Sequence, residues 1–416
     1  MPQKRGQART GTTGRKASVR WEAPSPAELS ALDDLGAAGD WEVHGTTVAL
    51  TNLDKELLPA SGGRQATTKR DLVRYYTTMA PVLLPYLADR PVNVHRFPDG
   101  VTQTGFWQKQ VPKHAPAWLT RWHYADARSG ESDTYAIVDS VPALAWMANA
   151  AAVELHPWTS AASDAHAPTW ALIDIDPGPS TTFDDVRYLA RLYRAGLDHL
   201  SVDALPKLTG QRGVHIFVPI AARYTFDETR AWVEALSRAV GANAPELVSW
   251  TWTKRDRRGL ARLDYTQNAV NKTLAAPFSV RAAAGAPVSV PIEWDSSTTT
   301  PSAATNGPWR TWPHASPRWA IRSSVSGVSP KRYRPCESSP TGLHGLLEHV
   351  HLVTRQGRGD CDPPGCPLQE GLGELLRLLV VDLGRQGRLV GVHDHVEQRR
   401  PVVCQPLLDS RLQVTG

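Results

Sequence analysis

Cysteine is absent from the first 335 residues of this 416-residue chain, so no disulfide framework supports that part. No run approaches the roughly 18 apolar residues that a helix needs to cross a bilayer. The first 20 residues are basic and polar, and they lack the apolar stretch of a secretory signal. These absences argue against a disulfide-stapled secreted domain and against a membrane protein, and they predict a cytoplasmic location.

Acidic residues are slightly outnumbered: 46 lysines and arginines face 41 aspartates and glutamates, which gives a net charge of +5 and a sequence pI of about 9.0. Such a balance suits a polyanionic partner, but many basic proteins bind no nucleic acid. The length allows two average domains or one large domain with extensions. Charge and length therefore permit a nucleic-acid enzyme without identifying one.

Three segments of different texture follow one another along the chain. Residues 1–38 read as a flexible basic N-terminal arm with a short helical piece near Pro26–Leu35, and residues 39–295 carry the signals of a folded domain. Residues 296–416 begin with a stretch rich in Ser, Thr, Pro and Trp. They hold all four cysteines and only one lysine, Lys331. We therefore expect one folded domain between an arm and an atypical tail.

Alternation of apolar and polar residues predicts strands, and apolar residues three and four apart predict helices. The predicted strands are Trp41–Leu50 (one or two strands), Pro91–Arg96, Thr134–Asp139, Trp170–Asp176, a pair within Leu208–Ile220, and Arg262–Tyr265. The predicted helices are Thr68–Leu83, Pro142–Ala150, Thr182–Ala195 and Phe226–Val240. This mixture argues for an α/β or α+β domain with a central sheet.

The predicted strand Trp170–Asp176 ends in two aspartates, Asp174 and Asp176, separated by one residue. Side chains at i and i+2 of a strand share one face, so both carboxylates point the same way. Adjacent like charges are unfavourable unless a cation lies between them, and hard oxygen ligands suit Mg²⁺ or Mn²⁺. A surface strand end with two solvated aspartates would give the same pattern. The apolar residues Ala171–Ile173 favour instead a buried strand with acids at its tip.

A third acid, Asp264, has a similar context. Three carboxylates can hold two metal ions about 3.5–4 Å apart, the arrangement that catalyses in-line phosphoryl transfer. The segment Lys207–Ile216 adds cations and a glycine-flanked turn whose backbone N–H groups suit phosphates. It is not a P-loop, because the required spacing is absent. An ordinary hairpin with a basic tip would look the same.

Seven sequence blocks, in the correct order, resemble the polymerase domain of bacterial ligase D, which belongs to the archaeo-eukaryotic primase superfamily and serves non-homologous end joining and gap repair. They span about Thr51 to Trp294, more than half of the chain. The blocks are Asn52–Pro59, Arg90–Gly100, Gly105–Lys109, Glu154–Trp158, Asp174–Asp176, Thr209–His215 and Asp264–Asn268. The resemblance implies an α+β primase-polymerase core, with a central mixed or antiparallel sheet flanked by helices.

The resemblance also implies roles for the residues at matching positions. The catalytic and metal-binding residues would be Asp174, Asp176 and Asp264, which would hold two Mn²⁺ or Mg²⁺ ions. The site for an NTP or dNTP would be lined by His156, Lys207, Thr209, Arg212, His215, Gln267, Lys272 and Arg281.

A DNA-binding surface is implied in the same way. Phe106 and Trp107 lie where the family stacks aromatic rings on bases, a sequence-tolerant contact. Asn52, Lys55 and Lys69 match a pocket for the 5′-phosphate at the far side of a gap, where lysines act as point charges. Core packing and a solvated basic face are the alternative explanations. The implied partners are gapped or broken duplex DNA with a 5′-phosphate, a separate DNA ligase and an end-binding protein, which would make the chain nucleoid-associated.

The resemblance stops after Trp294. Relatives usually continue with an acidic segment such as Glu-Leu-Asp-Asp-Pro and a closing helix, whereas residues 295–301 of this chain read Asp-Ser-Ser-Thr-Thr-Thr-Pro. Codons for the acidic segment, read one base out of register, give a sequence of this kind. We therefore hypothesise a frameshift near Asp295 that makes the tail 296–416 non-native, whether frameshifted throughout or disordered.

A genuine extra domain is the alternative explanation of the tail. Gly371–Val381 and Leu389–Val396 are apolar enough to fold. A zinc site in it would draw on Cys361, Cys366 and Cys404 with His393 or His395, but their irregular spacing argues against it.

Three classes of function compete for these residues. The leading one is a template-directed nucleotidyltransferase, a DNA or RNA polymerase or primase-like enzyme that extends 3′ ends at gaps or breaks by two-metal phosphoryl transfer. A non-catalytic DNA-end-binding scaffold for an end-joining ligase would need no aspartates. A glycoside hydrolase would need carboxylates that flank a bond at about 5–9.5 Å, whereas Asp174 and Asp176 lie on one side.

Overall fold

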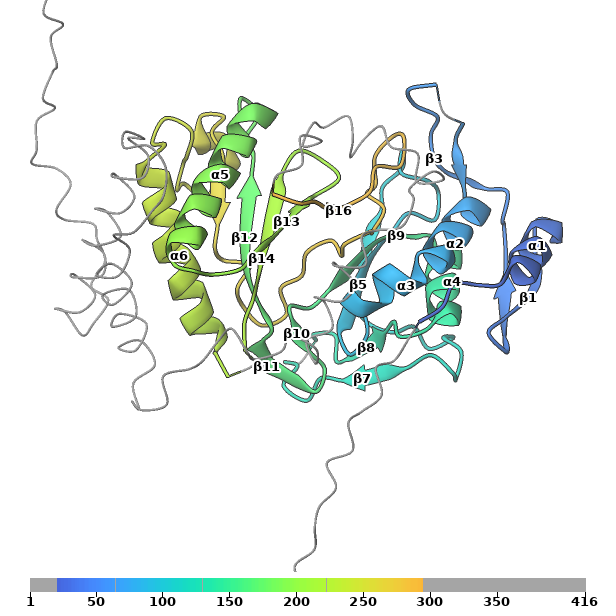
Figure 1. The fold of residues 1–416 in the computed structure, drawn as a ribbon. Coiled ribbons are helices and arrows are strands. Elements are labelled where there is room, and N and C mark those ends of the chain that lie inside the picture. Colours follow the sequence, from blue (N-terminus) through green and yellow to red (C-terminus); the bar gives the residue numbers. More distant parts are fainter. Residues whose placement is uncertain (1–20, 64, 129, 222, 295–416) are drawn as a thin grey trace, which may run out of the picture. The chain divides into compact units, whose positions relative to one another are not determined.

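Two five-stranded antiparallel sheets form the framework of the chain (Figure 1). The computed structural model describes residues 21–63, 65–128, 130–221 and 223–294, all within one compact unit. The first sheet contains β5 (Pro91–Arg96), β6 (Phe106–Gln108), β7 (Arg121–His123), β8 (Thr134–Ile137) and β9 (Ala152–Pro157). The second sheet contains β12 (Trp170–Asp176), β13 (Leu205–Leu208), β14 (Val214–Pro219), β15 (Arg262–Asp264) and β16 (Val290–Pro291). The hairpins are β1 (Gly39–Val43) with β2 (Thr46–Leu50), β3 (Glu56–Leu58) with β4 (Thr67–Thr68), and β10 (Ser160–Ala161) with β11 (Asp164–Pro168).

The described part contains six α-helices, five of which begin at a side-chain cap, and two 3₁₀ helices. They are α1 (Pro26–Asp34), α2 (Lys69–Thr78), α3 (Ala80–Leu83), α4 (Val141–Asn149), α5 (Phe183–His199) and α6 (Phe226–Ala242), with the 3₁₀ helices η1 (Leu84–Tyr86) and η2 (Lys254–Arg257). Capping boxes start α1, α2, α5 and α6, where a Ser or Thr side chain and an acid three residues later satisfy each other's backbone N–H groups. None of these helices combines the length and the apolar character needed to cross a membrane.

The second sheet presents two different faces. Ala171, Ile173 and Ile175 of β12 are buried in a core shared with α5 and α6, which lie together beside this sheet (Figure 1). Trp170 and Leu172 project from the opposite face, because successive residues of a strand point to opposite sides. Asp174 and Asp176 follow them on that second face. The helices therefore cover one face completely and leave the face with the aspartates free for other contacts.

The core of the first sheet is built with α2 and α4. Leu72 and Tyr76 of α2 and Leu144 of α4 are almost completely buried with the strand residues Val92 and Leu155. The polar tip of a buried tyrosine needs a partner, and the Tyr76 hydroxyl donates to the carbonyl oxygen of Val153 at 2.6 Å. The helix is thereby fixed on β9, the strand that carries Glu154 and His156.

Residues 273–291 join the cores of both sheets. The Ala276 N–H donates to the Leu155 carbonyl of β9 at 2.9 Å, and Phe278 and Val280 are buried in the first core. The segment then enters the second sheet as β16, beside β13. The last part of the described chain therefore completes the core that the first part begins.

The predicted α+β fold is confirmed, and every ladder between the named strands is antiparallel. Pro91–Arg96 and Trp170–Asp176 form strands over the predicted residues, and Trp41–Leu50 falls within β1 and β2. The helix predicted for Thr68–Leu83 is interrupted at Met79, two residues before a proline that cannot continue the hydrogen-bond ladder. The strand β9 gives no alternation signal, because all six of its residues are buried.

The prediction of a flexible arm that reaches residue 38 needs correction for residues 21–38. There α1 packs on the first core through Leu32, which is fully buried, and the Trp41 indole donates to the Glu28 carbonyl at 2.7 Å. Arg70 of α2 also donates to the carbonyl of Leu35 at 2.8 Å. The predicted arm 1–20 and tail 296–416, with the zinc alternative and the frameshift hypothesis, lie outside the described residues.

Asn268 holds the register of β12 and supplies a test of the fold. Its buried amide accepts from the Leu172 N–H and donates to the Leu172 carbonyl, both at 2.8 Å. Replacing it by alanine leaves both backbone groups unpaired, so we expect Asn268→Ala to lower the free energy of unfolding by about 3 kcal/mol. Urea unfolding measures the change. The control Asn243→Ala, which removes one half-buried hydrogen bond at the end of α6, should cost less than about 1 kcal/mol. Equal effects would contradict this account.

Candidate active site

Strand register sets four polar residues in one row across the second sheet. Lys207 of β13 is paired with His215 of β14, and His215 is paired with Asp174 of β12. Asp174 is paired in turn with Asp264 of β15. Directly opposed residues of antiparallel strands project from the same face. The row therefore runs from a lysine to two carboxylates, and it brings together residues that are far apart in the sequence.

Asp174 has the least favourable surroundings in this row. Its side chain is only 15% exposed, and burial together with the neighbouring Asp264 raises its pKa to about 7. The Nε2 atom of His215 lies 3.4 Å from Oδ1 of Asp174. Burial, aided by the charges of Lys207 and Arg281, holds the pKa of His215 well below its usual value. The imidazole is therefore neutral at pH 7, and its contact with Asp174 is not an ion pair.

The other two aspartates have partners. Oδ2 of Asp176 accepts a hydrogen bond of 2.9 Å from Nη1 of Arg257. Oδ1 of Asp264 accepts from the Thr266 hydroxyl at 2.6 Å and from its backbone N–H at 2.9 Å. Gln267 donates to Oδ2 of Asp264 at 3.2 Å, so this predicted nucleotide contact lies against a predicted metal ligand. Each of these two carboxylates accepts hydrogen bonds from neighbouring side chains, whereas the contact that Asp174 makes among the described side chains is the 3.4 Å approach of His215.

The donor set suits a hard divalent cation. Three carboxylates from adjacent strands share one face, and oxygen ligands are those that Mg²⁺ and Mn²⁺ prefer. Within the described residues, no three His, Cys, Asp or Glu side chains converge on one point as they stand. The reason is visible in the contacts, because Asp176 is held by Arg257 and Asp264 by Thr266. The type and backbone placement of these residues fit the predicted metal site, and Asp174 lacks the positive charge that an ion would supply.

Lys207 lies at the other end of the row and is completely buried. Its ammonium donates to the Ser289 hydroxyl at 2.6 Å and lies 5.7 Å from the centre of the Phe217 ring. Burial and the charge of Arg281 lower its pKa well below the usual value. None of the described carboxylates forms an ion pair with it. A lysine in this state gains stability from any anion that reaches it.

A tight loop, Thr209–Gly213, follows Lys207. The Thr209 hydroxyl accepts from the N–H groups of Gln211 and Gly213, both at 3.2 Å. Gly210 has a φ of +73°, and a Cβ atom there would lie 2.8 Å from the Arg281 side chain, so only glycine fits. Arg212 was predicted to line the triphosphate site. Its Nη2 atom donates to the carbonyls of the turn after β12, at Gly178 (3.0 Å) and Thr181 (2.7 Å), and so attaches the loop to that turn.

A buried carboxylate, Glu154, organises the neighbouring part of the first sheet. It is 3% exposed and binds His156 Nε2 and Arg281 Nε, each at 3.0 Å. Burial alone would raise the pKa of Glu154, but the His156 hydrogen bond and the Arg281 charge outweigh it and lower the pKa to about 2. Arg281 also donates to the Thr209 carbonyl at 2.9 Å. Two residues predicted for the nucleotide site, His156 and Arg281, therefore meet beside the Thr209–Gly213 loop.

The two aromatic residues predicted to contact DNA are exposed. Phe106 and Trp107 of β6 are 47% and 50% exposed, so neither is a core residue. Arg96 lies 5.2 Å from the centre of the Phe106 ring. Trp107 stacks on His95, with ring centres 4.4 Å apart and planes at 8°. Exposed rings backed by polar side chains are suited to stacking on bases.

The residues predicted for the 5′-phosphate pocket follow β2. Lys69, at the start of α2, is 6% exposed, and burial followed by the charges of Lys55 and Arg96 lowers its pKa. Lys55 pairs with the exposed Asp99 at 2.8 Å. Asn52 adopts a left-handed φ of +51° and accepts from the Lys55 N–H at 3.1 Å. Cations therefore cluster here with incomplete compensation. Lys272 is exposed, and its ammonium contacts no partner in the described part.

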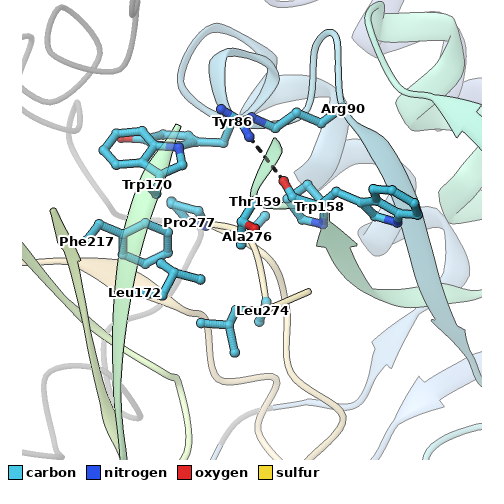
Figure 2. Close-up of a pocket in the computed structure, with 12 residues that line it drawn as sticks. Tyr86, Arg90, Trp158, Thr159, Trp170, Leu172, Phe217, Leu274, Ala276 and Pro277 are labelled. Carbon is cyan, nitrogen blue, oxygen red and sulfur yellow. Dashed lines mark hydrogen bonds between the residues drawn. The ribbon is translucent and has the colours of Figure 1, made fainter. Parts of the chain in front are cut away.

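A pocket lies farther down the face that carries the aspartates. Figure 2 shows Trp170, Leu172 and Phe217 on one side of it and Arg90 on another, with the Arg90 guanidinium donating to the Trp158 carbonyl at 3.1 Å. The cavity has a volume of about 20 Å³. That is enough for about one water molecule and too small for a nucleotide. This pocket is therefore not a candidate for the substrate site.

Sequence reasoning missed the cations that hold the carboxylates. Arg257 binds Asp176, and Arg262 Nε lies 3.6 Å from Asp264. Both are buried although they carry a charge. Arg257 ends η2 and Arg262 begins β15, and no spacing rule predicts that an arginine at such a position is buried. Glu154 lies inside one of the quoted blocks, two residues before His156 on one strand face. That i,i+2 spacing was the available signal for it.

Comparison with known proteins gives consistent matches. Residues 68–309 match the family described as LigD, primase-polymerase domain. The multifunctional non-homologous end joining protein LigD of Mycolicibacterium smegmatis is 35% identical over 250 residues, which are 60% of this chain and 32% of that protein. The bifunctional counterpart of Bacillus subtilis is 28% identical, over 59% of this chain and 38% of that protein. The polymerase domain from Mycobacterium tuberculosis Ligase D in complex with DNA has 32% identity and a TM-score of 0.54, covering 59% of this chain and 87% of that one. The matched region spans about a third of these curated relatives.

The raised pKa of Asp174 predicts a pH-dependent stability. Its native pKa of about 7 exceeds the ordinary value of 3.8, so the native state binds more protons and loses stability as the pH rises through that window. A pKa difference of this size corresponds to about 4 kcal/mol in the free energy of unfolding. In chelator, we therefore expect Asp174→Asn to raise the melting temperature at pH 8 and to have a much smaller effect at pH 4.

Two controls complete this test. The exposed substitution Asp198→Asn at the end of α5 should not change the pH dependence. Adding Mn²⁺ at pH 8 should stabilise the wild type more than Asp174→Asn, because ligand binding to the native state adds stability. A melting temperature of Asp174→Asn below that of the wild type at pH 8 in chelator would contradict the account.

Proposed function

This chain belongs to the ligase D primase-polymerase family, and on that premise we propose that it is a template-directed nucleotidyltransferase that extends 3′ ends at gaps or breaks in DNA. The observation that supports this most directly is the cross-strand row of the second sheet. It brings Asp264 to Asp174, and it ends on the buried ammonium of Lys207. Carboxylates for metal ions and a cation for phosphate are the two requirements of nucleotidyl transfer.

Asp174, Asp176 and Asp264 are the proposed metal ligands. They would hold two Mg²⁺ or Mn²⁺ ions, which would supply a lower pKa for an attacking 3′-hydroxyl and positive charge beside a leaving pyrophosphate. The chain's contribution is to fix three carboxylates on one rigid sheet face. Its apolar opposite face, packed on α5 and α6, keeps that geometry from relaxing.

Lys207, Thr209, His215 and Arg281 are the proposed contacts of the triphosphate. Lys207 is buried without a carboxylate partner, so a phosphate would supply its missing countercharge. Nδ1 of His215 is buried with no hydrogen-bond partner among the described residues, and it is therefore free to bind a phosphate or ribose oxygen. His156, Gln267 and Lys272 complete the proposed site. Arg212 has the indirect role of holding the Thr209–Gly213 loop.

Phe106 and Trp107 are proposed to stack on bases of the template, and Asn52, Lys55 and Lys69 to bind the 5′-phosphate beyond the gap. The partial exposure of both rings and the crowded charges around Lys69 support these roles. The relatives named above are end-joining proteins, so we propose end joining as the pathway, with a DNA ligase and an end-binding protein as partners. Those relatives are longer than the region that this chain matches, so the two partners are part of the proposal for this chain.

Primer extension tests the catalytic proposal. On a gapped duplex with Mn²⁺ or Mg²⁺, the wild type should incorporate a templated nucleotide. Asp174→Asn should reduce the rate by roughly a thousandfold or more, because several kcal/mol of charge stabilisation is lost. DNA affinity, measured by fluorescence anisotropy, should remain within about threefold. Absence of incorporation by the wild type, with tight DNA binding, would favour the non-catalytic scaffold instead.

The phosphate pocket is tested separately. Wild type should bind a gapped duplex more tightly when the downstream strand carries a 5′-phosphate. Lys69→Ala should reduce that preference about tenfold, because one charged hydrogen bond to the phosphate is lost. Arg230→Ala, an exposed residue of α6, removes the same charge and should leave the preference intact. A preference that survives Lys69→Ala would exclude this pocket.

A further inference from the structure

A second cross-strand row lies in the first sheet. Trp107 of β6 is paired with His95 of β5, and His95 is paired with Glu154 of β9. Because directly opposed residues project from one face, the three side chains are neighbours by register. The row begins at an exposed ring and ends at a carboxylate that is 3% exposed.

The contacts along this row are continuous. Trp107 stacks on His95 at 4.4 Å and meets His156 edge-on at 4.7 Å. Nδ1 of His95 lies 3.7 Å from Oε2 of Glu154, and the same oxygen binds His156 Nε2 at 3.0 Å. The exposed aromatic ring is therefore held through two imidazoles that share one carboxylate oxygen.

The other oxygen of Glu154 faces the second sheet. Oε1 accepts from Nε of Arg281 at 3.0 Å and from the Ala282 N–H at 2.9 Å. Arg281 continues to the Thr209 carbonyl, at the loop proposed for the triphosphate. One carboxylate thus connects the proposed template ring on one side with the proposed nucleotide contacts on the other.

If Glu154 served only to neutralise the charge of Arg281, its one contact with Arg281 would be sufficient. Burial lowers the pKa of both His95 and His156, so both imidazoles are neutral at pH 7. Among the described residues, Arg281 is then the one cation in contact with Glu154. A carboxylate retained only for charge would not need two imidazoles on its second oxygen. The two oxygens of the carboxylate instead contact groups that belong to different proposed binding surfaces.

We propose that Glu154 is a positioning residue that fixes the template-stacking Trp107 relative to the nucleotide contacts His156 and Arg281. A base stacked on Trp107 and a nucleotide held by His156 then meet in the geometry needed for pairing. This inference rests on the proposed polymerase function. It adds a physical link that makes selection of the nucleotide depend on the template ring.

Glu154→Gln tests the link, because glutamine keeps the shape and loses the charge that His156 and Arg281 bind. On a gapped duplex, we expect KM for the templated nucleotide to rise about tenfold, within the usual range of coupling between sites, with kcat changed less than about threefold. A purely structural role would lower the amount of active enzyme, and hence apparent kcat, without raising KM.

A double-mutant cycle makes the test specific. Trp107→Ala should raise the nucleotide KM in the wild type and have little further effect in Glu154→Gln, because the link is already broken. Phe106→Ala is the matched control, an equally exposed neighbour that contacts Arg96 and not the row. Its effect on KM should be the same in both backgrounds.

The outcomes separate the two levels of inference. If the wild type incorporates no nucleotide, the proposed function fails. If it does and the Trp107–Glu154 cycle is additive, the link alone is overturned. If Glu154→Gln does not fold, His95→Ala is the second variant. It removes the contact between Trp107 and Glu154 and leaves the hydrogen bond from Arg281 to Glu154 in place. The proposal requires that His95→Ala also raises the nucleotide KM, although His95 lies on the template side. An unchanged KM in His95→Ala would equally overturn the proposal.

Discussion

Repulsion between two carboxylates on neighbouring antiparallel strands is the constraint around which the site is organised. Asp174 and Asp264 are set opposite each other by strand register, and both side chains are largely removed from water. Thr266, Gln267 and Arg262 stabilise Asp264, and Arg257 stabilises Asp176. Asp174 alone remains without such support. The fold therefore carries a local instability that a cation would relieve, as is common where function and stability compete.

The same physical cause acts at both ends of the row. Loss of water disfavours the charged form of a carboxyl group and of an amine alike. Burial accordingly raises the pKa of Asp174 and lowers that of Lys207. A metal ion at one end and a phosphate at the other would each restore the charged form of its partner.

Local patterns were enough to predict much of the fold and to single out Asp174, Asp176 and Asp264 as candidate metal ligands, which remain a proposal. Trp170–Asp176 was recognisable because its apolar run ends in two acids, and helices α5 and α6 because of their periodicity. Pairing of Asp264 with Asp174 depends on the register of β12 with β15, which no local signal determines. The arrangement of Arg257 and Arg212 could not be predicted either. Each guanidinium binds groups that only the folded chain brings near, and Arg212 turned out to hold a loop.

The segment 273–291 has a consequence for how the chain reaches its native state. Phe278 and Val280 complete the core that Tyr76 and Leu144 begin, although the entire second sheet except β16 lies between them in sequence. The first core therefore cannot close during synthesis until almost the whole described region has left the ribosome. Contacts between such distant residues slow folding, since a long loop must be closed first. Dividing the chain between β11 and β12 would leave the second core whole in one fragment, whereas the other fragment would lack Phe278 and Val280 and could not complete the first core.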